Sequence, residues 1–370
     1  MTAIVRVGII GCGMVAEEYA TTLAASPLVR LTTCADADPA RADAFGGRHG
    51  IPATEPGSVL DPNIIDLAVI LTPPHTHHAL ALEAIAARVP GVWSEKPLAL
   101  TPGDVAQVVA EADTAGILLG AAPDTTLGPA FVTAHEAVRT GRIGTVLSAT
   151  ATLMSTGLKR WHPSPEPFYA QGAGPLGDMG PYYLAALDEL LGPLQVHAAT
   201  AHTRKVRTIR SGPAAGKHFT AQAPIHIGAL LTSADGVPVT LTASFDAAAT
   251  RTPRIELQGT RGALVLPDPN FHTGDVLFAE YGTFTWEPLP PTSGAPRMTG
   301  RGMGVIDLAT ALTQGTAPAC TGARAARVAA VSDAILRAAA RPHRALLTPP
   351  HQHGTAHAEG TTTIAKESTR

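Results

Sequence analysis

The first forty residues contain a strand, a glycine-rich turn, a helix, a second strand and an acidic residue, in that order. Residues 4–10 are almost continuously apolar, and residues 11–16, GCGMVA, match the pattern G-x-G-x-x-A. Asp36 stands 23 residues after Gly13, at the end of the next apolar run. This order is the fingerprint of a dinucleotide-binding βαβ unit, and it requires the chain to begin with parallel strands joined by crossover helices.

Each part of this fingerprint has a physical role. Gly11 permits the tight turn, and Gly13 lets the backbone approach a pyrophosphate at a helix N-terminus, where free N–H groups and the macrodipole favour an anion. Met14 and Val15 open that helix, and we expect them to contact the cofactor. Asp36 would accept hydrogen bonds from the ribose hydroxyls and repel a 2′-phosphate, so we predict NAD in preference to NADP.

Two further apolar runs end in polar loops. Residues 72–77 (TPPHTH) follow the third predicted strand, and residues 95–97 (EKP) follow the fourth. Ligands of a doubly wound sheet bind beyond the carboxyl ends of its strands. We therefore expect a cofactor site that includes Thr72, Pro73, His77, Glu95 and Lys96. Lys96 could donate to a substrate oxygen or lower a neighbour's pKa, and the alternative is a surface lysine paired with Glu95.

A second group of polar residues lies in the segment 172–183, GAGPLGDMGPYY. Asp178 and Tyr182 are four residues apart, so on a helix they share one face. A tyrosine hydroxyl has an ordinary pKa of ~10. Beside Lys96 we expect this pKa to be lowered, which would make Tyr182 a proton carrier near neutral pH. The alternatives are a helix N-cap for Asp178 and a core aromatic for Tyr182.

The order of apolar segments predicts an α/β protein with two sheets. Strands expected at 5–10, 30–35, 67–71, 91–94 and 117–120 alternate with helices at 14–25, 39–48, 76–88 and 102–115, which is typical of a doubly wound parallel sheet. Later strands, expected at 145–155, 195–206, 225–234, 237–246, 254–259 and 262–266, follow one another closely and favour an open, mostly antiparallel sheet. Helices are expected at 128–140, 179–191, 304–314 and 323–340, and a loop at 208–222. We divide the chain into domains at 1–123 and 124–348 and expect a mobile tail at 349–370.

Composition excludes several classes of protein. A chain of 370 residues with 45% apolar and 15% charged residues is expected to form two or three globular domains. The net charge of −3 gives no electrostatic reason to expect a nucleic acid or a membrane surface as partner. We find no apolar run of the ~18 residues that a membrane span needs, and no pattern of an export signal. Three cysteines form no disulfide framework, which favours the cytoplasm.

Taken in order, G-x-G-x-x-A with Asp36, T-P-P-x-x-H, E-K-P and G-x-G-P-x-x-D-M-G-x-Y resemble the Gfo/Idh/MocA family of NAD(P)-dependent oxidoreductases, which act mostly on sugars and cyclitols. The resemblance covers roughly residues 4–345. It implies an N-terminal Rossmann domain and a C-terminal α/β domain whose open sheet binds substrate near the nicotinamide. That sheet often forms the oligomer interface, which implies a homodimer or homotetramer. The resemblance also implies that Lys96 and the helix of Asp178 carry out proton transfer.

Two positions depart from the family pattern. Many members have histidine where this chain has Tyr182, although tyrosine occurs in some relatives, including sugar ketoreductases. Asp124 stands where many relatives carry an asparagine near the nicotinamide ribose. The stretch containing Trp161, His162 and Tyr169 resembles a subgroup of bacterial sugar dehydrogenases, so we expect these three side chains to contact substrate.

The sequence thus predicts an NAD-dependent oxidoreductase that transfers a hydride between nicotinamide and a secondary alcohol or ketone of a sugar, sugar derivative or cyclitol. One alternative is a redox-neutral enzyme with tightly bound NAD, which catalyses elimination or epimerisation through a transient keto sugar; His162 or Glu166 would supply its additional acid or base. A second alternative is a non-catalytic nucleotide-binding regulator. We expect no metal site, because the histidines of the C-terminal tail lack a scaffold to orient them: His351, His353 and His357.

Overall fold

The N-terminal half of the protein is built around a parallel sheet. The computed structural model describes residues 4–160, 162 and 164–341. Five strands pair in the order β2-β1-β3-β4-β5, and all of the pairings are parallel. The elements are β1 (Val5–Ile10), α1 (Met14–Ala24), β2 (Val29–Ala35), α2 (Pro39–His49), β3 (Leu67–Ile70), α3 (His77–Ala86), β4 (Gly91–Ser94), α4 (Pro102–Ala115) and β5 (Leu118–Ala121). The predicted doubly wound sheet is therefore confirmed.

Local chemistry defines the ends of its helices. The Thr101 hydroxyl accepts a hydrogen bond from the Asp104 backbone N–H at the start of α4, and Pro102 occupies the first turn. Helix α4 ends at Gly116, which is left-handed with φ of 69°. The two caps define where α4 begins and ends. Because this helix connects β4 to β5, they also fix where the chain leaves one parallel strand and enters the next.

A late segment of the chain packs on this sheet. Helix α8 (Met303–Gln314) contributes Val305 and Leu308 to the core that also contains Trp93 of β4. Gly304 lies directly against the Trp93 ring, where any side chain would collide. The loop before α8 therefore lies close to the carboxyl ends of the Rossmann strands. The division at residue 123 remains a prediction.

The second sheet has eight strands in the order β15-β14-β13-β12-β6-β11-β10-β7. The pairing of β11 with β6 is parallel and the others are antiparallel, which confirms an open, mostly antiparallel sheet. The strands are β6 (Val146–Met154), β7 (Leu194–His202), β10 (His226–Ser233), β11 (Pro238–Ser244), β12 (Ile255–Gly259), β13 (Gly262–Leu266), β14 (Leu277–Glu280) and β15 (Glu287–Pro288).

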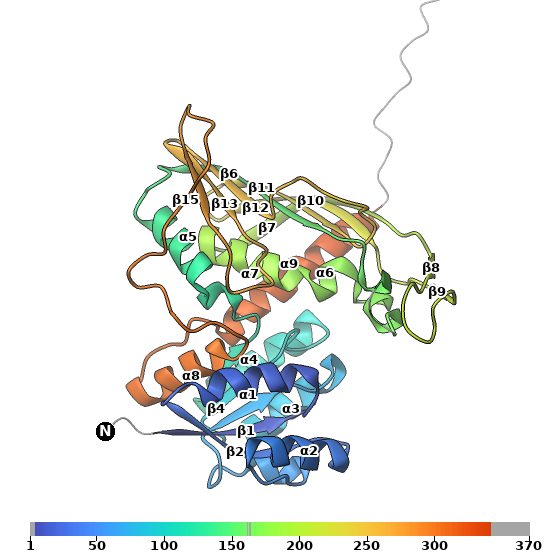
Figure 1. Ribbon diagram of the computed structural model, residues 1–370, viewed down its shortest axis with the longest axis vertical. Helices are drawn as coiled ribbons and strands as arrows, with labels where there is room; N and C mark the ends of the chain where they lie inside the picture. The colour runs from blue at the N-terminus through green and yellow to red at the C-terminus, as the bar shows by residue number, and fades with distance from the viewer. Residues whose placement is uncertain (1–3, 161, 163, 342–370) are drawn as a thin grey trace, which may run out of the picture. The chain divides into compact units, whose positions relative to one another are not determined.

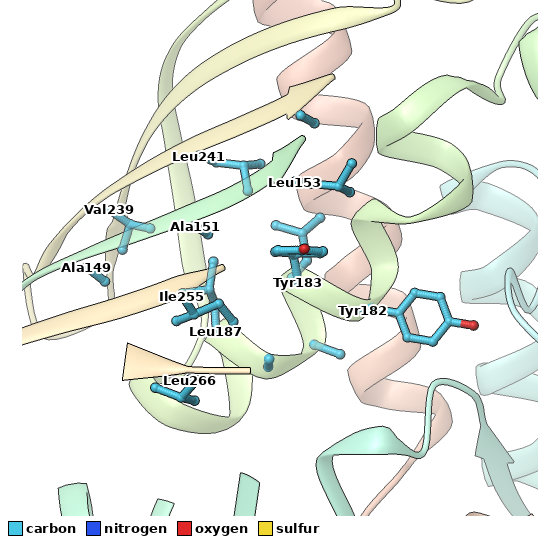
Figure 2. Packing of buried hydrophobic residues seen from close by; sticks show 14 of the residues in the cluster. Ala149, Ala151, Leu153, Tyr182, Tyr183, Leu187, Val239, Leu241, Ile255 and Leu266 are labelled. Atoms are coloured by element: carbon cyan, nitrogen blue, oxygen red, sulfur yellow. The ribbon is translucent and has the colours of Figure 1, made fainter. Parts of the chain in front are cut away.

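Helices cover one face of this sheet (Figure 1). They are α5 (Pro129–Arg139), α6 (Gly174–Asp178), α7 (Gly180–Leu191) and α9 (Gly322–Ala340). Burial alternates along the strands: Ile227, Ala229 and Leu231 of β10 are buried, whereas Leu230 is 54% exposed. Figure 2 shows Tyr183 of α7 among the residues of the sheet core, whereas the Tyr182 ring points away from the sheet.

Several sequence-based boundaries were wrong. The expected loop 208–222 contains β9 (His218–Thr220), which pairs with β8 (Val206–Thr208). The expected strand 195–206 ends at His202, and the helix expected at 179–191 is preceded by the short helix α6. Strands β14 and β15 were not expected. The predicted tail at 349–370 lies outside the described residues. No helix of the described part is long and apolar enough to cross a membrane.

Candidate active site

A cavity of about 510 Å³ lies where β4, α7 and the loop before α8 come together. The Rossmann side contributes the start of α1 and the loop after β4, and the other side contributes α6, α7, the end of β6 and loops of the second sheet. The polar and charged lining includes Glu18, Glu95, Lys96, His162, Asp178, Tyr182, Arg254, Asp268, Asn270 and Arg301.

Lys96 is directed to Asp178, and both residues line this cavity. Its ammonium donates to the Asp178 backbone carbonyl at 2.6 Å and to Asp178 Oδ1 at 3.0 Å, and its side chain is 16% exposed. Burial alone would lower the pKa of Lys96, but the Asp178 carboxylate, together with Tyr182 and Glu95, raises it above its ordinary value. Lys96 is thus held as a cation, and the third of its three N–H donors is left for a ligand.

Glu95 does not form the surface ion pair with Lys96 that the sequence allowed. Its Oε2 accepts a hydrogen bond from the Lys96 backbone N–H at 2.8 Å, and its Oε1 accepts from the Tyr19 hydroxyl at 3.0 Å. The residue is 8% exposed and lines the cavity. Glu95 therefore fixes the loop that presents Lys96.

Tyr182 lies between two cations. The Lys96 ammonium is 5.2 Å from the ring centroid, and Arg301 Nη1 donates to the Tyr182 hydroxyl oxygen at 2.9 Å. The expected lowering of its pKa was wrong. Burial raises the pKa of Tyr182, and the opposing charges of Lys96 and Arg301 do not fully offset it. Tyr182 is a neutral phenol, 3% exposed.

Sequence reasoning missed Arg301 and Asn270. Arg301 is 119 residues from Tyr182 in the chain, in a loop with no recognisable motif, and its Nη2 donates to Asn270 Oδ1 at 3.1 Å. Arg254 and Asp268 were also missed; their charged atoms lie 3.5 Å apart. No spacing rule connects these positions, because they meet only when the loop before α8 and the loops of the second sheet come together beside α7.

His77 is buried and links two loops. Its ring nitrogens lie 2.7 Å from the carbonyl oxygens of Pro97 and of Thr72, and it is 1% exposed. The structure thus places His77 behind the expected cofactor loop, while Thr72 is half-buried and Pro73 is exposed.

Asp124 lies beneath the loop that carries Arg301. Its Oδ2 accepts hydrogen bonds from the backbone N–H groups of Gly302 (2.8 Å) and Gly304 (3.1 Å), and its Oδ1 is 3.3 Å from His272 Nε2. Burial would raise the pKa of Asp124, but His272 and the two N–H groups lower it. Asp124 is 1% exposed, so its visible role is to fix the start of α8.

The three expected substrate residues differ in position. His162 lines the cavity, and its ring contacts Phe168 edge-on at 5.0 Å. Tyr169 is fully buried between Phe219 and Phe245 and is not among the lining residues. Trp161 lies outside the described residues. Glu166, the expected additional acid or base, is exposed on a short 3-10 helix.

The glycine turn leaves room for a ligand at the start of α1. Gly11 has φ of +98°, and a Cβ there would lie 2.7 Å from the Leu71 carbonyl carbon. Gly13 is the N-cap of α1 without a side chain, and a Cβ there would project into open space. A second cavity of about 350 Å³ is lined by Cys12, Gly13, Met14, Glu17, Arg41 and Arg48. Met14 lines both cavities, so the start of α1 borders the glycine turn on one side and the cavity of Lys96 on the other.

Comparison with known proteins decides the family. The family description "Oxidoreductase family, NAD-binding Rossmann fold" (GFO_IDH_MocA) matches residues 5–122, and the C-terminal domain of the same family matches residues 131–265. The chain belongs to the Gfo/Idh/MocA family. It is therefore an oxidoreductase with an NAD-binding Rossmann domain, as the sequence motifs predicted.

Individual relatives of the Gfo/Idh/MocA family are distant. The chain is 27% identical to trans-1,2-dihydrobenzene-1,2-diol dehydrogenase of Bos taurus, over 81% of this chain and 84% of that protein. It is 32% identical to inositol 2-dehydrogenase 1 of Saccharopolyspora erythraea over 38% of this chain and 43% of the relative. The structure of levoglucosan dehydrogenase with NADH and levoglucosan superposes with a TM-score of 0.77 at 22% identity, covering 91% of this chain and 97% of that chain.

The residues of the turn fit the NAD expected for this Gfo/Idh/MocA domain. Asp36 Oδ2 accepts from the Cys12 backbone N–H at 2.8 Å, and Oδ1 accepts from the Asp38 backbone N–H at 2.9 Å. Each carboxylate oxygen can accept a further hydrogen bond, which suits the two ribose hydroxyls. Arg41 is directed to Asp38, with Nε 3.6 Å from its carboxylate.

We predict that this domain binds NADH more tightly than NADPH, because the Asp36 carboxylate repels a 2′-phosphate. Asp36→Ala should narrow the ratio of the two dissociation constants by roughly tenfold, which corresponds to about 1.4 kcal/mol. Fluorescence titration of both nucleotides measures the ratio directly. Equal or tighter NADPH binding by the unmodified protein would contradict the prediction.

Proposed function

We propose that the protein is an NAD-dependent dehydrogenase or reductase acting on a secondary alcohol or ketone of a sugar, sugar derivative or cyclitol. The observation that carries this proposal is the cluster of Lys96, Asp178 and Tyr182 in the cavity next to the glycine turn. The relatives named as inositol and dihydrodiol dehydrogenases support a hydroxylated ring as substrate.

The side chains have distinct parts in this chemistry. NAD supplies the hydride acceptor or donor when it is bound, and the protein provides position and charge. Lys96 directs a fixed positive charge and a free N–H toward the substrate oxygen, which polarises the carbonyl or stabilises an alkoxide. Asp178 holds the ammonium in place. Tyr182 exchanges the proton with the same substrate oxygen.

Both cavity donors are protonated at neutral pH, because the pKa of Lys96 and the pKa of Tyr182 are raised. A ketone reduction consumes a proton, and this arrangement supplies one. An alcohol oxidation needs a proton acceptor, so its rate should increase as the solution becomes alkaline. At neutral pH the cluster is thus in the protonation state that ketone reduction requires.

A panel of sugars, keto sugars and cyclitols with NAD or NADH tests the proposal through the absorbance of reduced cofactor. We expect at least one member of the panel to be turned over with stoichiometric change of NADH. A product formed without net change of NADH would indicate the redox-neutral alternative. NADH binding without turnover of any member would support the regulator instead.

We also propose a homodimer or homotetramer formed through the second sheet. The sheet face opposite the helices exposes Leu147 and Leu230, each 54% accessible, among small and polar side chains. An open sheet with apolar residues on its outer face requires a cover. We predict a sedimentation coefficient larger than a monomer's at micromolar concentration, and a reduced one for a Leu230→Glu variant. A monomer at that concentration would contradict this proposal.

We place the enzyme in the cytoplasm. Cys12, Cys34 and Cys320 are buried free thiols, and a reducing compartment keeps such thiols reduced.

A further inference from the structure

The hydroxyl of Tyr182 is contacted by a guanidinium whose other nitrogens are also engaged. Arg301 Nη1 lies 2.9 Å from the Tyr182 oxygen, Nη2 lies 3.1 Å from Asn270 Oδ1, and Nε lies 3.3 Å from Glu18 Oε2. These partners come from α7, from the loop after β13 and from α1. The Arg301 side chain is 17% exposed, so its position is well determined by these contacts.

In the hydrogen bond between Arg301 and Tyr182, only the arginine can be the donor. A guanidinium has five N–H donors and no acceptor, so the Tyr182 oxygen must be the acceptor in its bond with Arg301. The Lys96 ammonium, 5.2 Å from the ring, also has no acceptor. The phenolic hydrogen of Tyr182 is used by neither cation. It therefore remains available to an acceptor in the cavity, which Tyr182 lines.

The same arginine also faces the charge that proton transfer creates. In the reduction of a ketone, the O–H bond of Tyr182 breaks and its proton goes to the substrate oxygen; bound NADH would supply the hydride to the carbonyl carbon. A phenolate then remains on Tyr182 until water reprotonates it. A hydrogen bond from a guanidinium to an anionic oxygen is stronger than one to a neutral oxygen, so Arg301 stabilises the product side of this transfer.

The loop that carries Arg301 is itself fixed from below. Asp124 accepts hydrogen bonds from Gly302 N and Gly304 N, directly after the arginine, and lies 3.3 Å from His272. His272 is two residues from Asn270, the second partner of Arg301. One buried carboxylate thus fixes the loop of Arg301 by two hydrogen bonds and contacts the loop that carries Asn270.

We propose that Arg301 is a positioning residue for catalysis, which orients the Tyr182 hydroxyl so that its proton faces the substrate and stabilises the phenolate after transfer. The inference rests on the proposed function, because it assigns the proton to Tyr182. In this chain, where many family members carry histidine, the tyrosine thus has a cation within hydrogen-bond distance of its hydroxyl.

Substitution of Arg301 separates this role from simple packing. We expect Arg301→Gln to lower kcat roughly tenfold or more, and Arg301→Lys to recover part of the loss, because lysine restores the charge without the fork geometry. In a Tyr182→Phe background, Arg301→Gln should have little further effect, since the two residues act as one unit. Arg254→Gln is the matched control: this other cavity arginine pairs with Asp268, so its effect should add to that of Tyr182→Phe.

A spectroscopic titration tests the same inference without turnover. Ultraviolet difference absorbance follows tyrosinate formation, and subtraction of the Tyr182→Phe spectrum isolates Tyr182. Besides Arg301, the charged groups that act on this hydroxyl are Lys96 and Glu95, while Glu18 acts through Arg301. We expect Tyr182 to ionise at higher pH in Arg301→Gln than in the unmodified protein.

An unchanged Tyr182 titration in Arg301→Gln, or additive effects of Arg301→Gln and Tyr182→Phe on kcat, would overturn the inference. Loss of thermal stability alone, with the pH profile unmoved, would reduce Arg301 to a structural contact. Absence of turnover in the unmodified protein would instead refute the proposed function. The two failures can be told apart, because the tyrosine titration does not depend on a substrate.

Discussion

Replacement of Lys96 by methionine will lower kcat by about 10²–10⁴-fold and leave the dissociation constant of NADH nearly unchanged. The reason is the position of its charge. Lys96 is held by Asp178 at 3.0 Å, beside Tyr182, and retains a free donor toward the cavity. Methionine has a similar length and no charge, so it removes the polarising group with little loss of packing.

Lys159→Met provides the matched control. Its side chain is also 16% exposed and its ammonium also faces a carboxylate, Asp246, at 3.5 Å. We expect both variants to lose some thermal stability: Lys96→Met leaves the Asp178 carboxylate without its cation, whereas after Lys159→Met the Asp246 carboxylate keeps Arg207 at 2.8 Å. Only Lys96→Met should lose most of its turnover. Measurement of kcat, NADH affinity and thermal midpoint for both separates the two effects. Near-normal turnover of Lys96→Met would return Lys96 to a structural ion pair.

The strands of the Rossmann domain were predictable almost to the residue. The apolar runs of β1, β3 and β4 are almost entirely buried and are followed within two residues by glycine or polar residues, so a local pattern defines these strands; β1 and β4 match their predicted bounds. The hairpin of β8 and β9 was missed because its strands are only three residues long and carry polar side chains. The formation of such short strands depends on the loops against which they pack.

The site was predictable only where it is built from strand ends. Lys96 follows β4 directly, so its position at the carboxyl edge was visible in the sequence. Arg301 was not, because its approach to Tyr182 depends on how the loop before α8 packs. The pKa of Tyr182 was predicted in the wrong direction for a related reason: the charge of Lys96 can be read from the sequence, whereas the cost of burial cannot.

Asp124 shows a further limit of motif reading. The family resemblance placed it near the nicotinamide ribose, and that contact remains a prediction. The structure adds a second role, because the carboxylate accepts from Gly302 N and Gly304 N at 2.8 and 3.1 Å. An asparagine at this position could keep both glycine bonds through its one carbonyl oxygen. Its NH₂ group would then face His272 Nε2 as a donor, where aspartate presents an acceptor oxygen.

Tyr182→Phe will reduce kcat by about 10²–10⁴-fold while the fold remains nearly intact. The substitution keeps the ring and removes only the hydroxyl, whose oxygen accepts from Arg301. Tyr183→Phe removes the neighbouring hydroxyl, which lies 3.4 Å from Asp268 Oδ1 on a ring that packs with the sheet core (Figure 2). We expect similar thermal midpoints for the two variants and a large difference in kcat.

The raised pKa of Tyr182 determines the pH dependence that we expect for reduction and for oxidation. Because burial raises the pKa of Tyr182 above its ordinary ~10, the hydroxyl stays protonated through neutral pH. The rate of ketone reduction should therefore stay constant up to alkaline pH, and the rate of alcohol oxidation should increase with pH over the same range.

Tyr182→His should retain part of the activity and move the rise in the oxidation rate toward the histidine pKa of ~6.5. A core aromatic would behave in the opposite way: phenylalanine would be harmless and histidine would destabilise the fold by burying a polar ring. A fully active Tyr182→Phe enzyme would leave Lys96 as the proton carrier.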